Sequence, residues 1–224
     1  MYFVYIGPGL ILSLYATWKT KSTFSKYSKV GSRNRMTGAQ AAAQMLQRNG
    51  ISGVKIEPTG GWLSDHYDPR HQVLRLSKDV YSGHSLSAIG VACHEAGHAM
   101  QDAQGYSMLN LRSALVPATN ISSYLSYFVM IGGFLLQHRS LLLVGVCLFS
   151  VGVVFALVTL PVEWDASRRA RVAMDEGGML SPDESRHASK VLNAAFLTYL
   201  AAALTSMLTL VYYLIQFGFL GGDD

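Results

Sequence analysis

The sequence contains few charged residues and only two cysteines. Charged residues make up 14% of the 224 residues, whereas half of the residues are hydrophobic. The hydrophobic residues are gathered in long runs, and this segregation is typical of a membrane protein. The two cysteines, Cys93 and Cys147, provide no disulfide framework, which fits a reducing compartment.

The net charge is also small, at +4, and much of it comes from one basic run that follows the first apolar segment. Membrane topology accounts for such a run, because lysine and arginine are enriched in the cytoplasmic loops of membrane proteins. The expected partner of the positive charge is therefore the lipid bilayer, and no nucleic-acid partner is expected.

One stretch carries an evident chemical motif. Residues 91–102 read VACHEAGHAMQD and contain His94, Glu95 and His98 in the pattern His-Glu-x-x-His. Apolar residues recur at helical spacing on both sides of the motif, which predicts that it lies on an α-helix. Two imidazoles one helical turn apart can bind one metal ion, while Glu95 lies beside them to hold water. The pattern predicts a zinc hydrolase with one Zn²⁺ per chain, and the competing interpretation is an amphipathic helix that carries two histidines by chance.

Four segments are predicted to span the membrane. The first is apolar and uncharged, and the basic residues follow it rather than precede it, which favours an uncleaved anchor over a signal peptide. The second and third are joined by a short link into a helical hairpin. The predicted organisation is an anchor at 1–18, the first part of a catalytic domain at 19–113, the hairpin at 114–160, the second part of that domain at 161–193, a span at 194–219 and a tail at 220–224.

This topology brings two distant parts of the chain to one side of the membrane. The hairpin returns the chain to the side that holds the motif, and the basic run after the first span predicts that this side is the cytoplasm, with both termini outside the cell membrane. The fold class predicted is mainly α, a multi-pass membrane protein with about four transmembrane helices and a small cytoplasmic α+β zincin-like domain.

Helix starts inside this domain can be predicted from capping residues. Thr37 with Gln40 forms a capping box, and Ser181 with Glu184 forms another at the start of the last helix. Ser85 precedes the motif helix as a candidate N-cap.

Two short alternating runs, 54–57 and 72–76, predict a β-hairpin or two neighbouring strands. If residues 72–76 form an exposed edge strand near the zinc, an extended substrate could pair with them through backbone hydrogen bonds. Proline at Arg75 or Leu76 would then abolish cleavage while leaving zinc bound.

The third metal ligand must come from outside the motif. A metzincin would need glycine and histidine where this sequence has Gln101 and Gln104, so that class is excluded. A carboxylate on a second helix completes other two-histidine zinc sites, and Glu163, at the membrane exit of the third span, is the best candidate. The alternatives are Asp102, Asp165, Glu176 and His187.

Three segments together resemble the YugP-type membrane zinc metallopeptidases, and the similarity covers nearly the whole chain. They are DHYDPR at 65–70, VLRLSKDVYSGHSLSAIGVACHEAGHAMQ and PVEWDASRRA. More distantly, the chain is similar to the HtpX and CAAX-prenyl endopeptidase group. The resemblance implies zinc at His94, His98 and Glu163, with Glu95 as the catalytic base. The distant group usually supports one zinc-bound histidine with an aspartate four residues after its glutamate, where this sequence has Ser167, so the support of the histidines is left open.

The expected reaction is hydrolysis of peptide bonds in membrane-associated or unfolded polypeptides. Glu95 would take a proton from the attacking water and pass one to the leaving amine. The oxyanion that forms needs a second donor besides the metal. His66 is favoured for this role because DHYDPR holds many polar groups in a short turn, and the other candidates are Tyr67, His71, Tyr106 and Arg168.

Two other functions are left open, a membrane scaffold or assembly factor that retains a zinc site, and a metal-handling membrane protein. Glu95 argues against the first, and the spans lack the internal row of acids or histidines that an ion path requires. A homo-oligomer or a second membrane protein stays open as a partner. Arg168, Arg169 and Arg171 would either contact anionic lipid head groups or form a solvated helix face.

Overall fold

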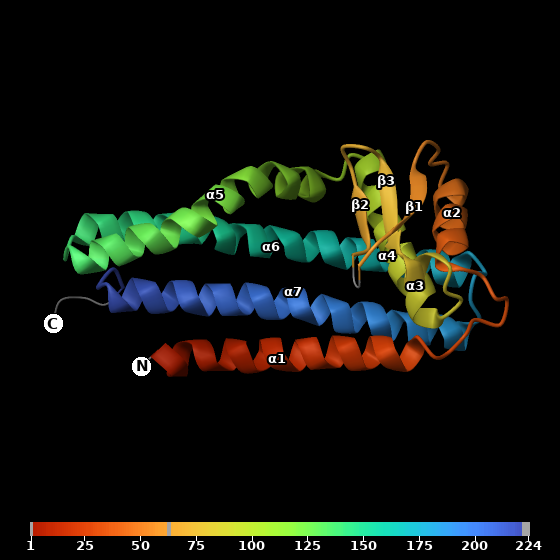
Figure 1. The fold of residues 1–224 in the computed structure, drawn as a ribbon, viewed down its shortest axis with the longest axis horizontal. Coiled ribbons are helices and arrows are strands. Elements are labelled where there is room, and N and C mark those ends of the chain that lie inside the picture. The colour runs from red at the N-terminus through yellow and green to blue at the C-terminus, as the bar shows by residue number, and fades with distance from the viewer. Residues whose placement is uncertain (1, 62–63, 221–224) are drawn as a thin grey trace.

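The apolar runs fold into long helices, and the more polar segments fold into short elements gathered at one end of them (Figure 1). The computed structural model describes residues 2–61 and 64–220. Those residues form seven α-helices and one three-stranded sheet, so the prediction of a mainly helical fold with a small sheet is confirmed.

The long helices are α1 (Tyr2–Tyr27), α5 (Ser107–Leu135), α6 (Arg139–Glu176) and α7 (Pro182–Gln216). Within the described residues, α5, α6 and α7 are long and apolar enough to cross a membrane. α1, which holds the predicted first span, is not among them. α6 continues without a break past residue 160, so the second part of the predicted domain begins inside the helix that also contains the predicted third span.

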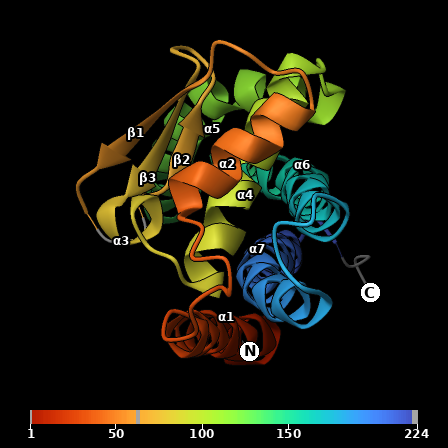
Figure 2. The ribbon, with the colours of Figure 1, turned by 90° about the vertical axis from the view of Figure 1, so that its right-hand side faces the viewer.

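The four long helices form one layer in the order α1, α7, α6, α5, as the view along their axes shows (Figure 2). Small residues allow the close approach between them. A Cβ atom on Gly9 of α1 would lie 2.7 Å from the Thr205 Oγ1 of α7, and one on Gly145 of α6 would overlap the Met130 side chain of α5. Such small-residue contacts are typical of helices that pack within a membrane.

The sheet contains β1 (Lys55–Thr59), β2 (His66–Asp68) and β3 (Val73–Ser77) in the order β1-β3-β2. β1 and β3 are neighbours, as predicted, but they run parallel, so the hairpin alternative is wrong. β2, from the segment interpreted as a polar turn, pairs antiparallel with β3.

The prediction that residues 72–76 form an exposed edge is also wrong. β3 has a hydrogen-bonded strand on each side, and its residues are buried apart from the partly exposed Arg75. Proline at Arg75 or Leu76 would break this central strand and would not test substrate pairing.

The helices of the domain are α2 (Gly38–Arg48), the short α3 (Lys78–Tyr81), which was not predicted, and α4 (Leu86–Ala103). Both predicted capping boxes are present, and the Ser85 hydroxyl accepts a hydrogen bond from the Ala88 amide at the start of α4. The core around α4 includes the fully buried side chains of Met45, Leu74, Leu76, Leu86, Ile89 and Met174. α4 is therefore held on all sides, and its motif face has a fixed direction.

Candidate metal centre

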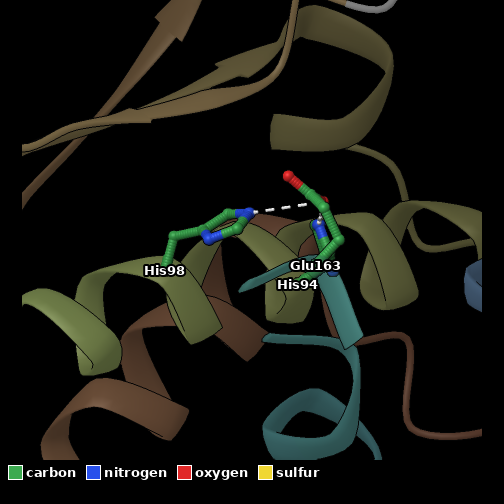
Figure 3. Close-up of side chains that lie close together, drawn as sticks. All are labelled: His94, His98 and Glu163. Atoms are coloured by element: carbon green, nitrogen blue, oxygen red, sulfur yellow. Dashed lines mark hydrogen bonds and ion pairs between the residues drawn. The ribbon is translucent and has the colours of Figure 1, made fainter. Parts of the chain in front are cut away.

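Three potential ligands converge where α4 crosses α6 (Figure 3). The Nε2 atom of His94 lies 3.2 Å from Oε2 of Glu163, and the Nε2 atom of His98 lies 3.7 Å from the same oxygen. The three ligand atoms lie within 4.8 Å of one another. Glu163 is only 2% exposed and His98 8% exposed, so the donors face one another in a largely enclosed space.

Gly97, between the two histidines, is what lets the helices meet. A Cβ atom at this position would lie 2.6 Å from the carbonyl oxygen of Ala166 on α6, a separation that no side-chain rearrangement can relieve because the oxygen belongs to the backbone. Ala166 is itself fully buried. The glycine and the alanine therefore bring the backbone of α4 against that of α6, within one turn of Glu163.

Each histidine is oriented by a neutral side chain. The Nδ1 atom of His94 lies 3.1 Å from Oγ of Ser167, and the Nδ1 atom of His98 lies 3.0 Å from Oε1 of Gln101. A hydroxyl and an amide oxygen can both accept a hydrogen bond from Nδ1–H, so each ring can give up its Nε2 proton to present that atom to a metal ion while it keeps this bond. Ser167, at the position where the distant group has an aspartate, therefore contacts His94.

The orientation of Gln101 is in turn set by α6. Its Nε2 group donates hydrogen bonds to the Val162 carbonyl at 2.8 Å and to Oδ2 of Asp165 at 3.1 Å. Asp165 also forms ion pairs with Arg168 and Arg169. Because the amide nitrogen of Gln101 faces two acceptors, its oxygen is the atom that turns to His98.

The charge at the site suits a divalent cation. Burial alone would raise the pKa of the Glu163 carboxyl, but hydrogen bonds to His94 and His98 outweigh it and hold this pKa well below its usual range. Glu163 is therefore ionised at neutral pH, as a metal ligand must be. Two imidazole nitrogens and one carboxylate are the donor set of catalytic zinc sites that keep a fourth position open, so these residues fit zinc.

A cavity of about 170 Å³ opens beside two of the three ligands, His94 and Glu163. Glu95 lines it together with His94 and Glu163, and α7 supplies an apolar wall that includes Leu192, Ala195 and Phe196. In this cavity, a carboxylate that could transfer a proton therefore lies next to a surface that could hold an apolar group.

Comparison with known proteins agrees with this geometry. Residues 2–218 match the family described as "Putative neutral zinc metallopeptidase". The "Putative membrane protease YugP" of Bacillus subtilis (strain 168) is 44% identical over 225 residues, which cover 100% of this chain and 99% of that protein. The chain belongs to this zinc metallopeptidase family. No solved structure matches it.

The structure places the alternative ligands away from these three residues. Asp102 accepts a hydrogen bond from the Tyr67 hydroxyl, and Asp165 pairs with the arginines of its own helix. The His187 ring stacks on Tyr27 at 5.0 Å between centroids, and Glu176 is exposed at the end of α6. Within the described residues, only His94, His98 and Glu163 form a group close enough to hold a metal ion.

The residues predicted as second donors lie outside the lining of the cavity. His66 is exposed on β2, with its Nδ1 atom 2.7 Å from the carbonyl of Ser64. His71 contacts Asp68, Arg168 contacts Asp165, and Tyr106 lies under the guanidinium of Arg169. The catalytic role of His66 stays a prediction.

Three residues at the site were not predicted to act there. Gln101 was noted only because it excludes a metzincin. Arg112, on α5, places its Nη1 atom 3.4 Å from Oε1 of Glu163, and an arginine at the start of an apolar helix is a signal that could have found it. Tyr199, on α7, lines the cavity with Glu95, and nothing in the sequence around it distinguishes it from other tyrosines.

Proposed function

We propose that this chain is a membrane endopeptidase that uses zinc to hydrolyse peptide bonds in membrane-associated or unfolded proteins. The observation that carries the proposal is the convergence of the His94, His98 and Glu163 ligand atoms within 4.8 Å, with Glu95 in the lining of the adjoining cavity. Membership of the zinc metallopeptidase family supports the same reaction class.

Zinc, when bound by His94, His98 and Glu163, supplies a Lewis acid that polarises the peptide carbonyl and lowers the pKa of water to about 7. Glu95 accepts the proton of the attacking water and delivers a proton to the leaving amine. Ser167 and Gln101 keep the two imidazoles in the tautomer that presents Nε2.

Tyr199 is the best-placed donor for the oxyanion. Its side chain lines the cavity that also contains Glu95 and Glu163, whereas the ring of His66 contacts its own loop. The Tyr199 hydroxyl lies within hydrogen-bond reach of Glu163, and a phenol donates one hydrogen bond without adding a positive charge, so it would stabilise a negative oxygen that forms beside this ligand.

The cavity indicates which substrates suit the site. Its apolar wall on α7 would hold an apolar side chain next to the bond that is cut, because aliphatic and aromatic groups there exclude water from such a chain. β2, rather than β3, is the edge strand that lies over α4, as the hydrogen bond from Tyr67 to Asp102 indicates. An extended substrate segment would pair with β2.

The membrane placement that we propose has four spans. α1 lies antiparallel along α7, with Ser13 Oγ 3.2 Å from Thr205 Oγ1 and the Thr20 hydroxyl bonded to the Ala194 carbonyl at 2.7 Å. The apolar part of α1 therefore lies at the same depth as that of α7. The basic residues that follow the apolar part of α1 favour a metal centre on the cytoplasmic side, with both termini outside.

Trp164, which follows Glu163, sets the depth of the site. Its side chain is 49% exposed, and its ring packs against Phe196 at 5.2 Å between centroids. Exposed tryptophan is typical of the membrane–water interface. The metal centre would therefore lie at the membrane surface, where it can cut segments close to a transmembrane helix.

The test is to purify the protein in detergent, measure zinc per chain, and compare cleavage of casein by the wild type and Glu95→Gln. We expect zinc in both and cleavage in the wild type alone, with an apolar residue on one side of each cut. Glu57→Gln is the matched control, since Glu57 is exposed on β1, and it should cut like the wild type. Equal cleavage by Glu95→Gln and the wild type would overturn the mechanism.

A further inference from the structure

A groove lies between α1 and α7, and none of the three candidate metal ligands lines it. It has a volume of about 560 Å³. From α1 it is lined by Lys19, Ser22, Thr23 and Lys26, among others, and from α7 by Lys190 and Asn193.

The lining residues recur at helical spacing on both walls. Positions 19, 22, 23 and 26 form one face of α1, and positions 190, 193, 194 and 197 form one face of α7. The two faces are joined by the hydrogen bond from the Thr20 hydroxyl to the Ala194 carbonyl, at 2.7 Å. The groove is therefore a rigid feature of the helix pair and not a gap between mobile loops.

Its charge is of one sign. The three lysines are exposed, and within the described part of the chain none forms an ion pair with a carboxylate. α1 contains no Asp or Glu, and the two acids of α7, Asp183 and Glu184, lie in its first turn and do not line the groove. Hydroxyl groups of Ser22 and Thr23 and the amide of Asn193 add hydrogen-bonding groups between the cations.

The groove lies at the end of the apolar part of each helix. In α1 the uncharged run ends at Trp18, directly before Lys19, and in α7 the apolar part begins at Ala194, directly after Asn193. Tyr15 and Leu197 form the end of the groove nearer the apolar segments. Cationic and polar side chains thus give way to apolar ones along the membrane normal, as the head group of a phospholipid gives way to its acyl chains.

We propose that this groove binds the head group of an anionic phospholipid through Lys19, Lys26 and Lys190. The inference rests on the proposed membrane placement of α1 and α7. Phosphate bears the complementary charge, and basic pockets between transmembrane helices on the cytoplasmic side recognise such head groups. The apolar end of the groove favours a lipid over free phosphate, because it would hold the first segment of an acyl chain.

The test uses the full chain purified in detergent. Phosphatidylglycerol, phosphatidylcholine or inorganic phosphate is added, and bound lipid is counted by native mass spectrometry while the thermal midpoint is followed. We expect the wild type to bind phosphatidylglycerol at least about tenfold more tightly than phosphatidylcholine. Lys19→Gln/Lys26→Gln/Lys190→Gln should lose this preference, and the matching triple arginine variant should keep it.

The matched control is Lys55→Gln/Arg70→Gln/Lys78→Gln, which removes the same charge from exposed positions on the sheet side. It should retain the preference for phosphatidylglycerol. Equal losses in both glutamine triples would overturn the proposal, because the effect would then come from net charge. Stabilisation by inorganic phosphate equal to that by phosphatidylglycerol would also overturn it.

Failure of the proposed function is distinguishable from failure of this inference. Lipid counting needs no peptidase activity. A protein that binds phosphatidylglycerol through the groove but cuts no casein would therefore contradict only the proposed peptidase function. A chain that cuts casein but shows no lipid preference would contradict only the proposal that the groove binds an anionic lipid. Zinc content and the thermal midpoint without lipid, equal in all triples, show that each variant is folded.

Discussion

Gln101 illustrates how a single buried side chain links the two halves of the metal centre. It is fully buried, accepts from His98 on its own helix and donates to Val162 and Asp165 on α6. A neutral amide suits this place because it can satisfy an N–H and two oxygens at once. The side chain therefore fixes the His98 ring and also ties α4 to the helix that carries Glu163.

At the residue scale, Gln101→Ala and Ser167→Ala should each weaken zinc binding by about tenfold to a hundredfold, because the partner that orients a ligating histidine is lost. Competition with a chelator measures the affinity. Gln104→Ala is the control, since Gln104 is also a glutamine near the end of the motif helix but bonds Arg169 instead of a ligand. An unchanged zinc affinity in Gln101→Ala would show that α6 packing alone orients His98.

At the residue scale, Tyr199 and His66 are alternative candidates for the donor that stabilises the oxyanion. If the Tyr199 hydroxyl stabilises the oxyanion, Tyr199→Phe should lower kcat by about a hundredfold to a thousandfold with little change in KM and in zinc content. His66→Ala should then retain most of the activity. The opposite result, a large loss of kcat in His66→Ala alone, would restore the role predicted from the DHYDPR segment.

At the element scale, the crossing of α4 and α6 determines whether a metal centre exists. Gly97→Ala would place a methyl carbon against the Ala166 carbonyl, where only 2.6 Å is available. We expect a loss of about 1–3 kcal/mol in the free energy of unfolding, together with weaker zinc binding. Thermal or denaturant unfolding in detergent measures it.

The control for this prediction is Gly31→Ala, since a Cβ atom at Gly31 meets nothing within 4 Å. Its stability should stay within about 0.5 kcal/mol of the wild type. Equal stability of Gly97→Ala and the wild type would mean that the two helices can separate without loss, and that the crossing does not hold the ligands together.

At the scale of the whole molecule, the proposed topology puts the α5–α6 link outside and the sheet inside. The experiment replaces exposed Cys147 by serine and keeps Cys93, whose burial raises the pKa of its thiol to about 12 and leaves it unreactive. Gln137→Cys should then react with an impermeant maleimide in intact cells, whereas Lys55→Cys should react only after permeabilisation. Labelling of Lys55→Cys in intact cells would reverse the orientation.

Local features were predicted well because they depend on neighbours in sequence. The capping residues Thr37, Ser85 and Ser181 each start the helix expected of them, since a cap needs only the amides of the next turn. The strand between residues 66 and 68 was missed because a three-residue strand in a polar segment has no periodic pattern to detect. The prediction of a β-hairpin was wrong for a related reason, since two alternating runs do not reveal that a third strand lies between them in the sequence.

The sequence by itself determined the metal-binding motif, the apolar helices and the candidacy of Glu163, because each is a matter of residue type, spacing along one helix or the order of the chain. Only the tertiary structure decided that Ser167 and Gln101 support the histidines, that Tyr199 and Arg112 reach the site, and that β3 is central. These contacts join residues that are far apart in the chain, and they depend on how closely two helix backbones approach, which a single glycine at position 97 controls.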